Sequence, residues 1–148
     1  MKRVLLLGTL LLILIFPSCS SDSDAQPSVV TARINGVDHI FNTVNVDTQT
    51  FTEDDVTYTD VIVTASIDNN PNNRISFIVE RGVLGLDASW YFAYFLDETA
   101  HPSIDGFQTS VTENTNNRLV GTFAGQVQAD EEPFEIIDIE NGTFDINY

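Results

Sequence analysis

The sequence predicts an all-β domain, an antiparallel β-sandwich of about eight strands. From Val29 onward the chain consists of short alternating runs rich in Val, Ile, Thr, Phe and Tyr. Clusters of Asn, Gly, Asp and Pro interrupt these runs roughly every 8 to 12 residues, and no run has a helical period of useful length. Strands and turns at this spacing favour a sandwich, with a flattened calycin-like barrel as the alternative.

The first half of the domain predicts two hairpins, with strands over residues 30–34, 37–41, 57–67 and 74–80. Asn35-Gly36 separates the first two strands, and both residues tolerate the positive φ that a tight two-residue turn requires. The polar run 68–73 contains Asn, Asp and Pro and provides the turn of the second hairpin.

The second half predicts strands over residues 89–95, 107–113, 119–127, 134–140 and 143–148. In the strand over 119–127, Gly121 and Gly125 share a face with apolar residues, so the strand is expected to bend or to meet a bulky neighbour there. Asn141-Gly142 predicts the tight turn of a last hairpin, with a positive φ at Gly142.

The run 90–95 is the aromatic-rich part of the domain. In a regular strand Trp90, Phe92 and Tyr94 face one side. The simplest interpretation is a central strand buried between the two layers, where aromatic side chains contribute a large buried area. The alternative is a platform on which a sugar ring stacks, with neighbouring acidic or amide side chains bound to its hydroxyls. Its ligand-binding residues would be Trp90, Tyr91 and Tyr94.

Residues 1–18 have the pattern of a signal peptide that ends at the single cysteine, Cys19. Lys2 and Arg3 form a positive n-region, 4–16 is an apolar h-region, and the small Ser18 precedes the cysteine. The apolar run is shorter than the roughly 20 residues of a membrane-spanning helix, which favours a cleaved leader. The pattern resembles a bacterial lipoprotein signal, which implies that Cys19 is acylated. The alternative is an ordinary signal peptide with an incidental cysteine.

After such a cleavage the chain is strongly acidic. Residues 19–28 are small, polar and acidic and predict a flexible linker between the lipid and a single β domain over 29–148. Loss of residues 1–18 leaves four arginines against 22 acidic side chains, a net charge of −18. This charge excludes nucleic acid as a partner, because nucleic-acid binding depends on Lys and Arg that neutralise phosphates.

The residues do not predict an enzyme. His39 and His101 are the only histidines, and neither belongs to a pair with metal-ligand spacing. Ser89 lacks the Gly-x-Ser-x-Gly setting of a nucleophile elbow. His101 precedes a proline among loop signals and is interpreted as a turn residue, and His39 as a partly exposed strand residue.

No cofactor is expected, with calcium as the alternative, because carboxylates are the hard oxygen ligands that calcium prefers. The acidic clusters at 53–55 and 130–132 and the turn that begins at Asp68 provide such groups. The run from Asp68 fails the helix-loop-helix calcium pattern, since Asn73 replaces the turn glycine and Val79 occupies the twelfth position. Solvated hairpin turns are the competing interpretation of the candidate metal ligands, Asp54, Asp55, Asp68 and Asp130.

Four segments carry a resemblance: the acidic linker, residues 31–37 near the start of the domain, and residues 119–125 and 139–148 at its end. Together they resemble the small all-β lipoproteins of Flavobacteria and other Bacteroidota, in which such segments bracket one domain. His39 stands where that pattern has an aromatic residue. The acidic residues after Cys19 also resemble the export tag that takes Bacteroidota lipoproteins to the cell surface.

We therefore expect an outer-membrane lipoprotein on the cell surface, with the periplasmic face as the alternative. It would contact the membrane through its lipid only and act as a non-catalytic binding or accessory module. The alternatives are a structural envelope component without a small ligand and a glycan-binding protein that uses the aromatic strand. The sequence leaves the ligand, any envelope protein partner and the oligomeric state open.

Overall fold

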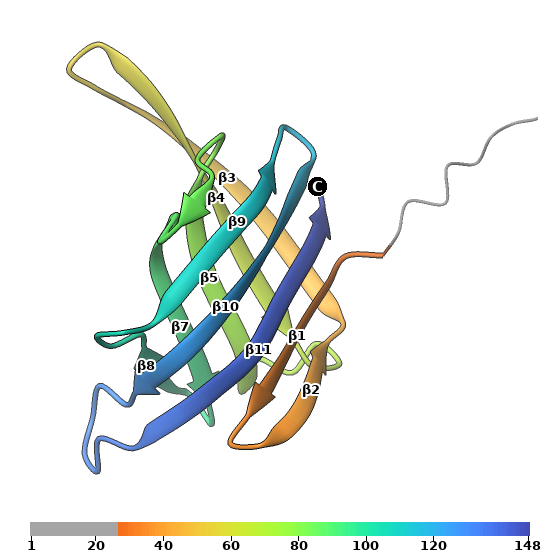
Figure 1. Ribbon diagram of the computed structural model, residues 1–148, viewed down its shortest axis with the longest axis vertical. Helices are drawn as coiled ribbons and strands as arrows, with labels where there is room; N and C mark the ends of the chain where they lie inside the picture. Colours follow the sequence, from red (N-terminus) through yellow and green to blue (C-terminus); the bar gives the residue numbers. More distant parts are fainter. Residues whose placement is uncertain (1–26) are drawn as a thin grey trace, which may run out of the picture.

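The computed structural model describes residues 27–148, which form two antiparallel β-sheets packed face to face (Figure 1). The strand order is β2-β1-β11-β10-β9-β6 in the six-stranded sheet and β3-β4-β5-β7-β8 in the five-stranded sheet. The predicted sandwich is confirmed, and the sheets do not close into the alternative barrel. The predicted signal peptide, Cys19 and most of the predicted linker lie outside the described residues.

Eleven strands make up the described part of the chain, against about eight predicted. The six-stranded sheet contains β1 (Val29–Ile34), β2 (Val37–Phe41), β6 (Gly85–Leu86), β9 (Gln108–Asn114), β10 (Arg118–Gln128) and β11 (Ile136–Asn147). The five-stranded sheet contains β3 (Thr43–Glu53), β4 (Val56–Ser66), β5 (Asn73–Glu80), β7 (Ser89–Leu96) and β8 (Thr99–Pro102). None of the described residues belongs to a helix long and apolar enough to cross a membrane.

Both hairpins predicted in the first half of the domain are present. β1 and β2 meet across Asn35 and Gly36, whose φ angles of 47° and 79° are those of a tight two-residue turn. β4 and β5 pair from Ser66 and Arg74 back to Asp60 and Glu80. Residues Val61, Val63 and Ala65 of β4 are completely buried, so this face of the hairpin forms part of the core.

β3 was not among the predicted strands, and it pairs with β4 along its whole length. The two strands join at Asp54 and Asp55, whose φ angles of 49° and 65° make a second tight turn. Val44 and Val46 at the start of β3 pack against the core, whereas the strand is exposed from Asp47 to its end. The distal part of this hairpin extends beyond the sandwich in Figure 1.

The predicted last hairpin is wrong, because residues 136–147 form one continuous strand. β11 pairs with β10 on one side and with β1 on the other, so both halves of the strand already have neighbours. The positive φ falls on Asn141, at 51°, and Gly142 does not have one. The register of both ladders shifts at this point, so the residues that suggested a turn form a bulge instead.

Two copies of the tripeptide Gly-Thr-Phe, 121–123 in β10 and 142–144 in β11, lie side by side in opposite directions. Gly121 pairs with Phe144, and Phe123 pairs with Gly142. A Cβ atom at Gly121 would lie 2.3 Å from the Phe144 ring, and one at Gly142 would lie 2.4 Å from the Phe123 ring. Each ring therefore occupies the space that a side chain on the opposite strand would fill, which confirms the bulky neighbour predicted at Gly121.

These rings connect the two sheets through an aromatic core. Phe144 lies 4.9 Å from Phe77 of β5, and Phe123 lies 4.9 Å from Phe92 of β7, as measured between ring centroids. Phe107, just before β9, lies 4.4 Å from Phe92. Phe77, Phe92, Phe123 and Phe144 are each no more than 3% exposed. The aromatic core thus lies between the two sheets. The candidate functional surfaces are therefore the outer faces of the sandwich.

Replacement of Gly142 by Val should lower the free energy of unfolding by about 1–3 kcal/mol, because the new side chain would displace the Phe123 ring. The measurement is urea denaturation. Ala124→Val is the matched control, since Ala124 is exposed one residue after Phe123 and a surface change should stay within about 0.5 kcal/mol. Equal midpoints for Gly142→Val and the control would contradict the described packing.

Candidate functional site

The outer surface of the five-stranded sheet carries two exposed aromatic pairs, Phe51 with Tyr58 and Trp90 with Tyr91, here together called the aromatic face. Phe51 and Tyr58 pair across β3 and β4, with stacked rings whose centroids lie 5.4 Å apart. Trp90 and Tyr91 are consecutive in β7, with ring centroids 6.5 Å apart and planes inclined by 59°. Trp90 is 62% exposed, Phe51 42% and Tyr91 37%.

A bulge in β7 places Trp90 on this surface. Ile78 of β5 pairs with Tyr91 and the next residue, Val79, pairs with Ser89, so Trp90 is an extra residue in the ladder. The Ser89 hydroxyl donates to the carbonyl oxygens of Ile78 and Tyr91, at 3.0 and 2.6 Å, which stabilises the bulge. The simple alternation is broken here, and the expected burial of Trp90 is wrong.

Of the three predicted ligand-binding side chains, Tyr94 is separated from the other two. It is 2% exposed on the inner side of β7, and its hydroxyl donates to Asn73 Oδ1 at 3.1 Å. Burial, with a smaller contribution from the negative charge of Asp97, raises the pKa of Tyr94 above the ordinary value of 10.0. Trp90 and Tyr91 therefore remain as the exposed pair.

This pKa shift predicts a loss of stability in alkaline solution. Tyr94 in the folded state keeps its proton at a pH where the unfolded chain releases it, so its contribution is complete below about pH 10 and lost as the pH rises through the folded pKa. Urea denaturation between pH 9 and 11 should show a shallower decline for Tyr94→Phe than for the wild type. If the free energy of unfolding fell equally with pH in both proteins, the alkaline loss of stability would not come from Tyr94.

Asp60 is a buried carboxylate beneath the aromatic face. It is 8% exposed, and the indole Nε1 of Trp90 donates to its Oδ1 at 3.4 Å. Glu80 lies directly opposite Asp60 on β5, so the two carboxylates share one face of the sheet. Asp60 was not among the predicted site residues, although a charged residue directly before the apolar run 61–63 indicates an unusual position for an aspartate.

The four predicted metal ligands are not brought together. Asp54 and Asp55 form the tip of the β3–β4 hairpin, whereas Asp68 lies at the other end of β4 and accepts a 2.8 Å hydrogen bond from Asn42 Nδ2. Asp130 lies between β10 and β11, where its backbone N–H donates to the Ala100 carbonyl. No group of three or more His, Cys, Asp and Glu side chains in residues 27–148 is placed to hold a metal ion.

The two histidines also differ in their surroundings. His101 is not a turn residue, because it belongs to β8, is 2% exposed and has its Nδ1 3.2 Å from the Thr99 carbonyl oxygen. His39 is partly buried in β2, with its ring 6.4 Å from that of Phe41. The Ser89 hydroxyl is engaged with backbone carbonyl oxygens. His101 and Ser89 are thus engaged with backbone carbonyl oxygens, and His39 lies beside Phe41.

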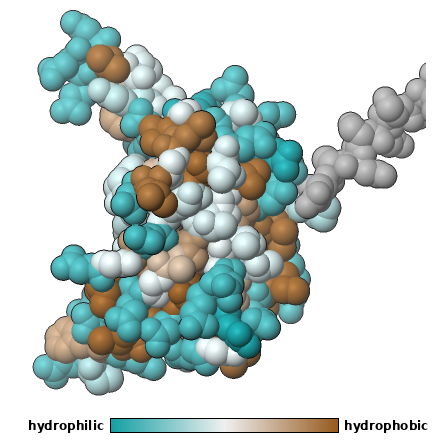
Figure 2. All heavy atoms as spheres, in the orientation of Figure 1, coloured by the Kyte–Doolittle hydropathy of each residue, from teal (hydrophilic) through white to brown (hydrophobic). Residues whose placement is uncertain are grey.

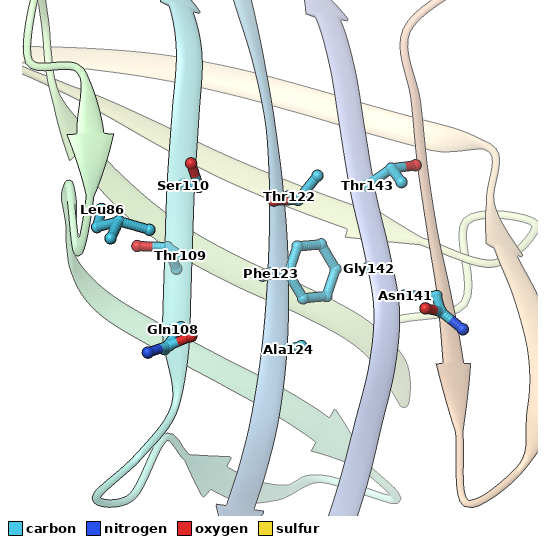
Figure 3. A pocket seen from close by; sticks show the side chains of 10 residues that line it. All are labelled: Leu86, Gln108, Thr109, Ser110, Thr122, Phe123, Ala124, Asn141, Gly142 and Thr143. Carbon is cyan, nitrogen blue, oxygen red and sulfur yellow. The ribbon is translucent and has the colours of Figure 1, made fainter.

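The outer surface of the six-stranded sheet has a shallow hollow of about 410 Å³ (Figure 3). Its floor is a row in register across four strands, formed by Thr143, Thr122, Ser110 and Leu86. No charged side chain lines it, and the middle of this surface is correspondingly pale in Figure 2. Its one aromatic side chain, Phe123, is 3% exposed and turned into the core, so the hollow has no exposed ring for stacking.

Comparison with protein families, with curated proteins and with solved structures finds no match for this chain. Of the two outer surfaces, the aromatic face combines exposed rings with a buried hydrogen-bond acceptor, a combination suited to a ligand with both apolar and hydroxylated sides.

Proposed function

We propose that this protein is a lipid-anchored component of the cell envelope that binds a glycan without catalysis, with the aromatic face as its binding surface. The observation that carries the proposal is the exposure of Trp90, at 62%, beside Tyr91. A sugar ring has an apolar face that can pack on an aromatic ring, and hydroxyls that Asp60 and Glu80 can accept hydrogen bonds from. The fixed bulge in β7 holds the indole in place before any ligand arrives.

The negative charge of the protein favours neutral glycans over anionic ones. A chain with a net charge of −18 after loss of residues 1–18 repels polyanions, and the carboxylates of Asp60 and Glu80 add to this repulsion locally. The ligand proposed here is therefore a neutral polysaccharide. The same carboxylates are good acceptors for sugar hydroxyls, because hydrogen bonds to charged acceptors are stronger than those between neutral groups.

The location belongs to the proposal as well. A leader that ends at Cys19, an acidic linker over 19–28, and the resemblance to Bacteroidota lipoproteins support an outer-membrane lipoprotein at the cell surface. The domain begins at Val29, immediately after that linker, so a lipid on Cys19 would leave both outer surfaces accessible to the medium. The periplasmic face is the alternative location.

Binding to neutral polysaccharides should depend on Trp90. Intrinsic fluorescence and affinity electrophoresis against a panel of neutral plant and microbial glycans are the measurements. Loss of one stacking ring is worth about 1–3 kcal/mol, so Trp90→Ala should weaken binding about tenfold or more.

Phe134→Ala is the matched control, since Phe134 is 49% exposed in the loop before β11 and should not affect binding. If no glycan in the panel alters Trp90 emission in the wild-type protein, the second candidate, a structural envelope component without a small ligand, replaces this proposal.

The lipid anchor has its own test. Metabolic labelling with a fatty-acid probe should mark the wild-type protein, and Cys19→Ala should abolish the label and release the protein from the membrane fraction. Ser20→Ala is the control, because it leaves the thiol in place. A label that persists in Cys19→Ala would contradict the anchor.

A further inference from the structure

β3 forms one edge of the five-stranded sheet, and it differs from the other three edge strands of the sandwich. It is 11 residues long, whereas β2 has 5, β8 has 4 and β6 has 2. Its ladder with β4 runs from Thr43 to Glu53 without a shift in register, and the strand contains neither lysine nor proline. Short length, bulges, prolines and lysines are devices that keep further strands from adding to a sheet edge. The edge of β3 is therefore open to another strand.

The geometry of the β3–β4 hairpin shows which backbone groups face this edge. Asp54 and Asp55 make a two-residue turn, so Glu53 and Val56 exchange both of their backbone hydrogen bonds, as does every second pair along the ladder. The odd-numbered residues of β3 thus bond to β4, and the even-numbered residues turn their N–H and carbonyl groups to the edge. In agreement, the Thr59 carbonyl of β4 accepts a 2.7 Å hydrogen bond from the chain at the end of β5, on the side away from β3.

Three threonines, Thr48, Thr50 and Thr52, present these edge groups where the hairpin extends beyond the sandwich (Figure 1). On this side no strand of residues 27–148 pairs with β3. Hydroxyl hydrogen bonds of 3.1 and 3.2 Å join Thr50 to Thr59 and Thr52 to Thr57 on one face of the hairpin. The stacked aromatic pair of β3 and β4 supports the other face. The edge is thus held in strand conformation before any partner binds.

The charge of the hairpin limits what can pair with it. Residues 43–66 contain five acidic side chains and neither lysine nor arginine. Asp47 and Glu53 lie on the outer face at the two ends of the exposed part of β3, and neither forms an ion pair within residues 27–148. A second copy of the chain would bring the same charge, and full antiparallel overlap of two β3 strands would place their Asp47 side chains diagonal to each other. A basic strand is favoured instead.

We propose that the exposed edge of β3 binds an extended, basic segment of a partner protein, which adds to the five-stranded sheet as a further strand. Backbone hydrogen bonds to the three threonines supply the affinity, and side chains on the outer face supply the selectivity. In an antiparallel partner, lysine or arginine lies opposite Asp47 and Glu53. An apolar side chain lies opposite Phe51, which is 42% exposed.

This edge is distinct from the indole of the proposed glycan site. Trp90 belongs to β7, which is separated from β3 by β4 and β5. Trp90→Ala should therefore leave binding of the basic segment unchanged. Failure of strand addition leaves the glycan proposal to its own test.

A probe peptide matched in length to residues 47–53 tests the proposal. It has blocked ends, lysine at its first and last positions, valine opposite Phe51 and threonine elsewhere. Fluorescence anisotropy should show saturable binding that weakens as salt is added, because the paired charges are exposed. Solvent-exchange NMR of the wild-type protein should show slower exchange of the Thr48, Thr50 and Thr52 amides when the peptide is bound. A peptide with glutamate in place of lysine should not bind.

Two sets of variants separate backbone pairing from charge. Thr50→Pro removes an edge donor without removing a bond to β4, and it should weaken peptide binding about tenfold or more. Thr50→Val is the matched control, because it also loses the hydroxyl contact with Thr59 but keeps the N–H. Asp47→Asn combined with Glu53→Gln should weaken binding about threefold or more, whereas Asp97→Asn, at the end of β7, should not.

Three results would overturn the proposal. The first is a peptide that leaves the exchange of the three threonine amides unchanged, a measurement that needs only the wild-type protein and decides the matter even if Thr50→Pro does not fold. The second is equal binding of the lysine and glutamate peptides. The third is amide protection that rises with protein concentration in the absence of peptide, which would show that a second copy of the chain occupies the edge.

Discussion

Reciprocal packing of two glycines against two phenylalanines determines how β10 and β11 take part in the core. Because Gly121 and Gly142 have no side chains, the rings of Phe144 and Phe123 can lean across the neighbouring strand, and both then reach aromatic rings of the opposite sheet. The same two strands turn Thr122 and Thr143 outward, where they form the floor of the uncharged hollow. One tripeptide used twice thus shapes the inner and the outer surface of the six-stranded sheet.

Alternation of apolar and polar residues was enough to predict the sandwich and the hairpins of its first half. It failed for β3, where Asp47, Gln49 and a series of threonines leave little apolar signal, because most of the strand is exposed on both faces. It failed again at Asn141-Gly142, where the local preference for a turn was overridden by neighbours on both sides of β11. Turn residues report the backbone angles that a segment allows, and tertiary pairing decides between a turn and a bulge.

The candidate site was partly visible in the sequence. The aromatic strand stood out, but one extra residue in the β7 ladder moved Trp90 from the expected core to the surface, while Tyr94 remained buried. A bulge depends on register with the neighbouring strand, which a single sequence does not encode locally.

The position of β1 has a mechanical consequence. This first strand is not at an edge, since it is paired with β2 on one side and β11 on the other. Tension that enters the domain through the chain before Val29 therefore runs along a strand held by two ladders. Such a load acts on the hydrogen bonds of both ladders, with β2 and with β11, instead of on the single pairing that an edge strand would have.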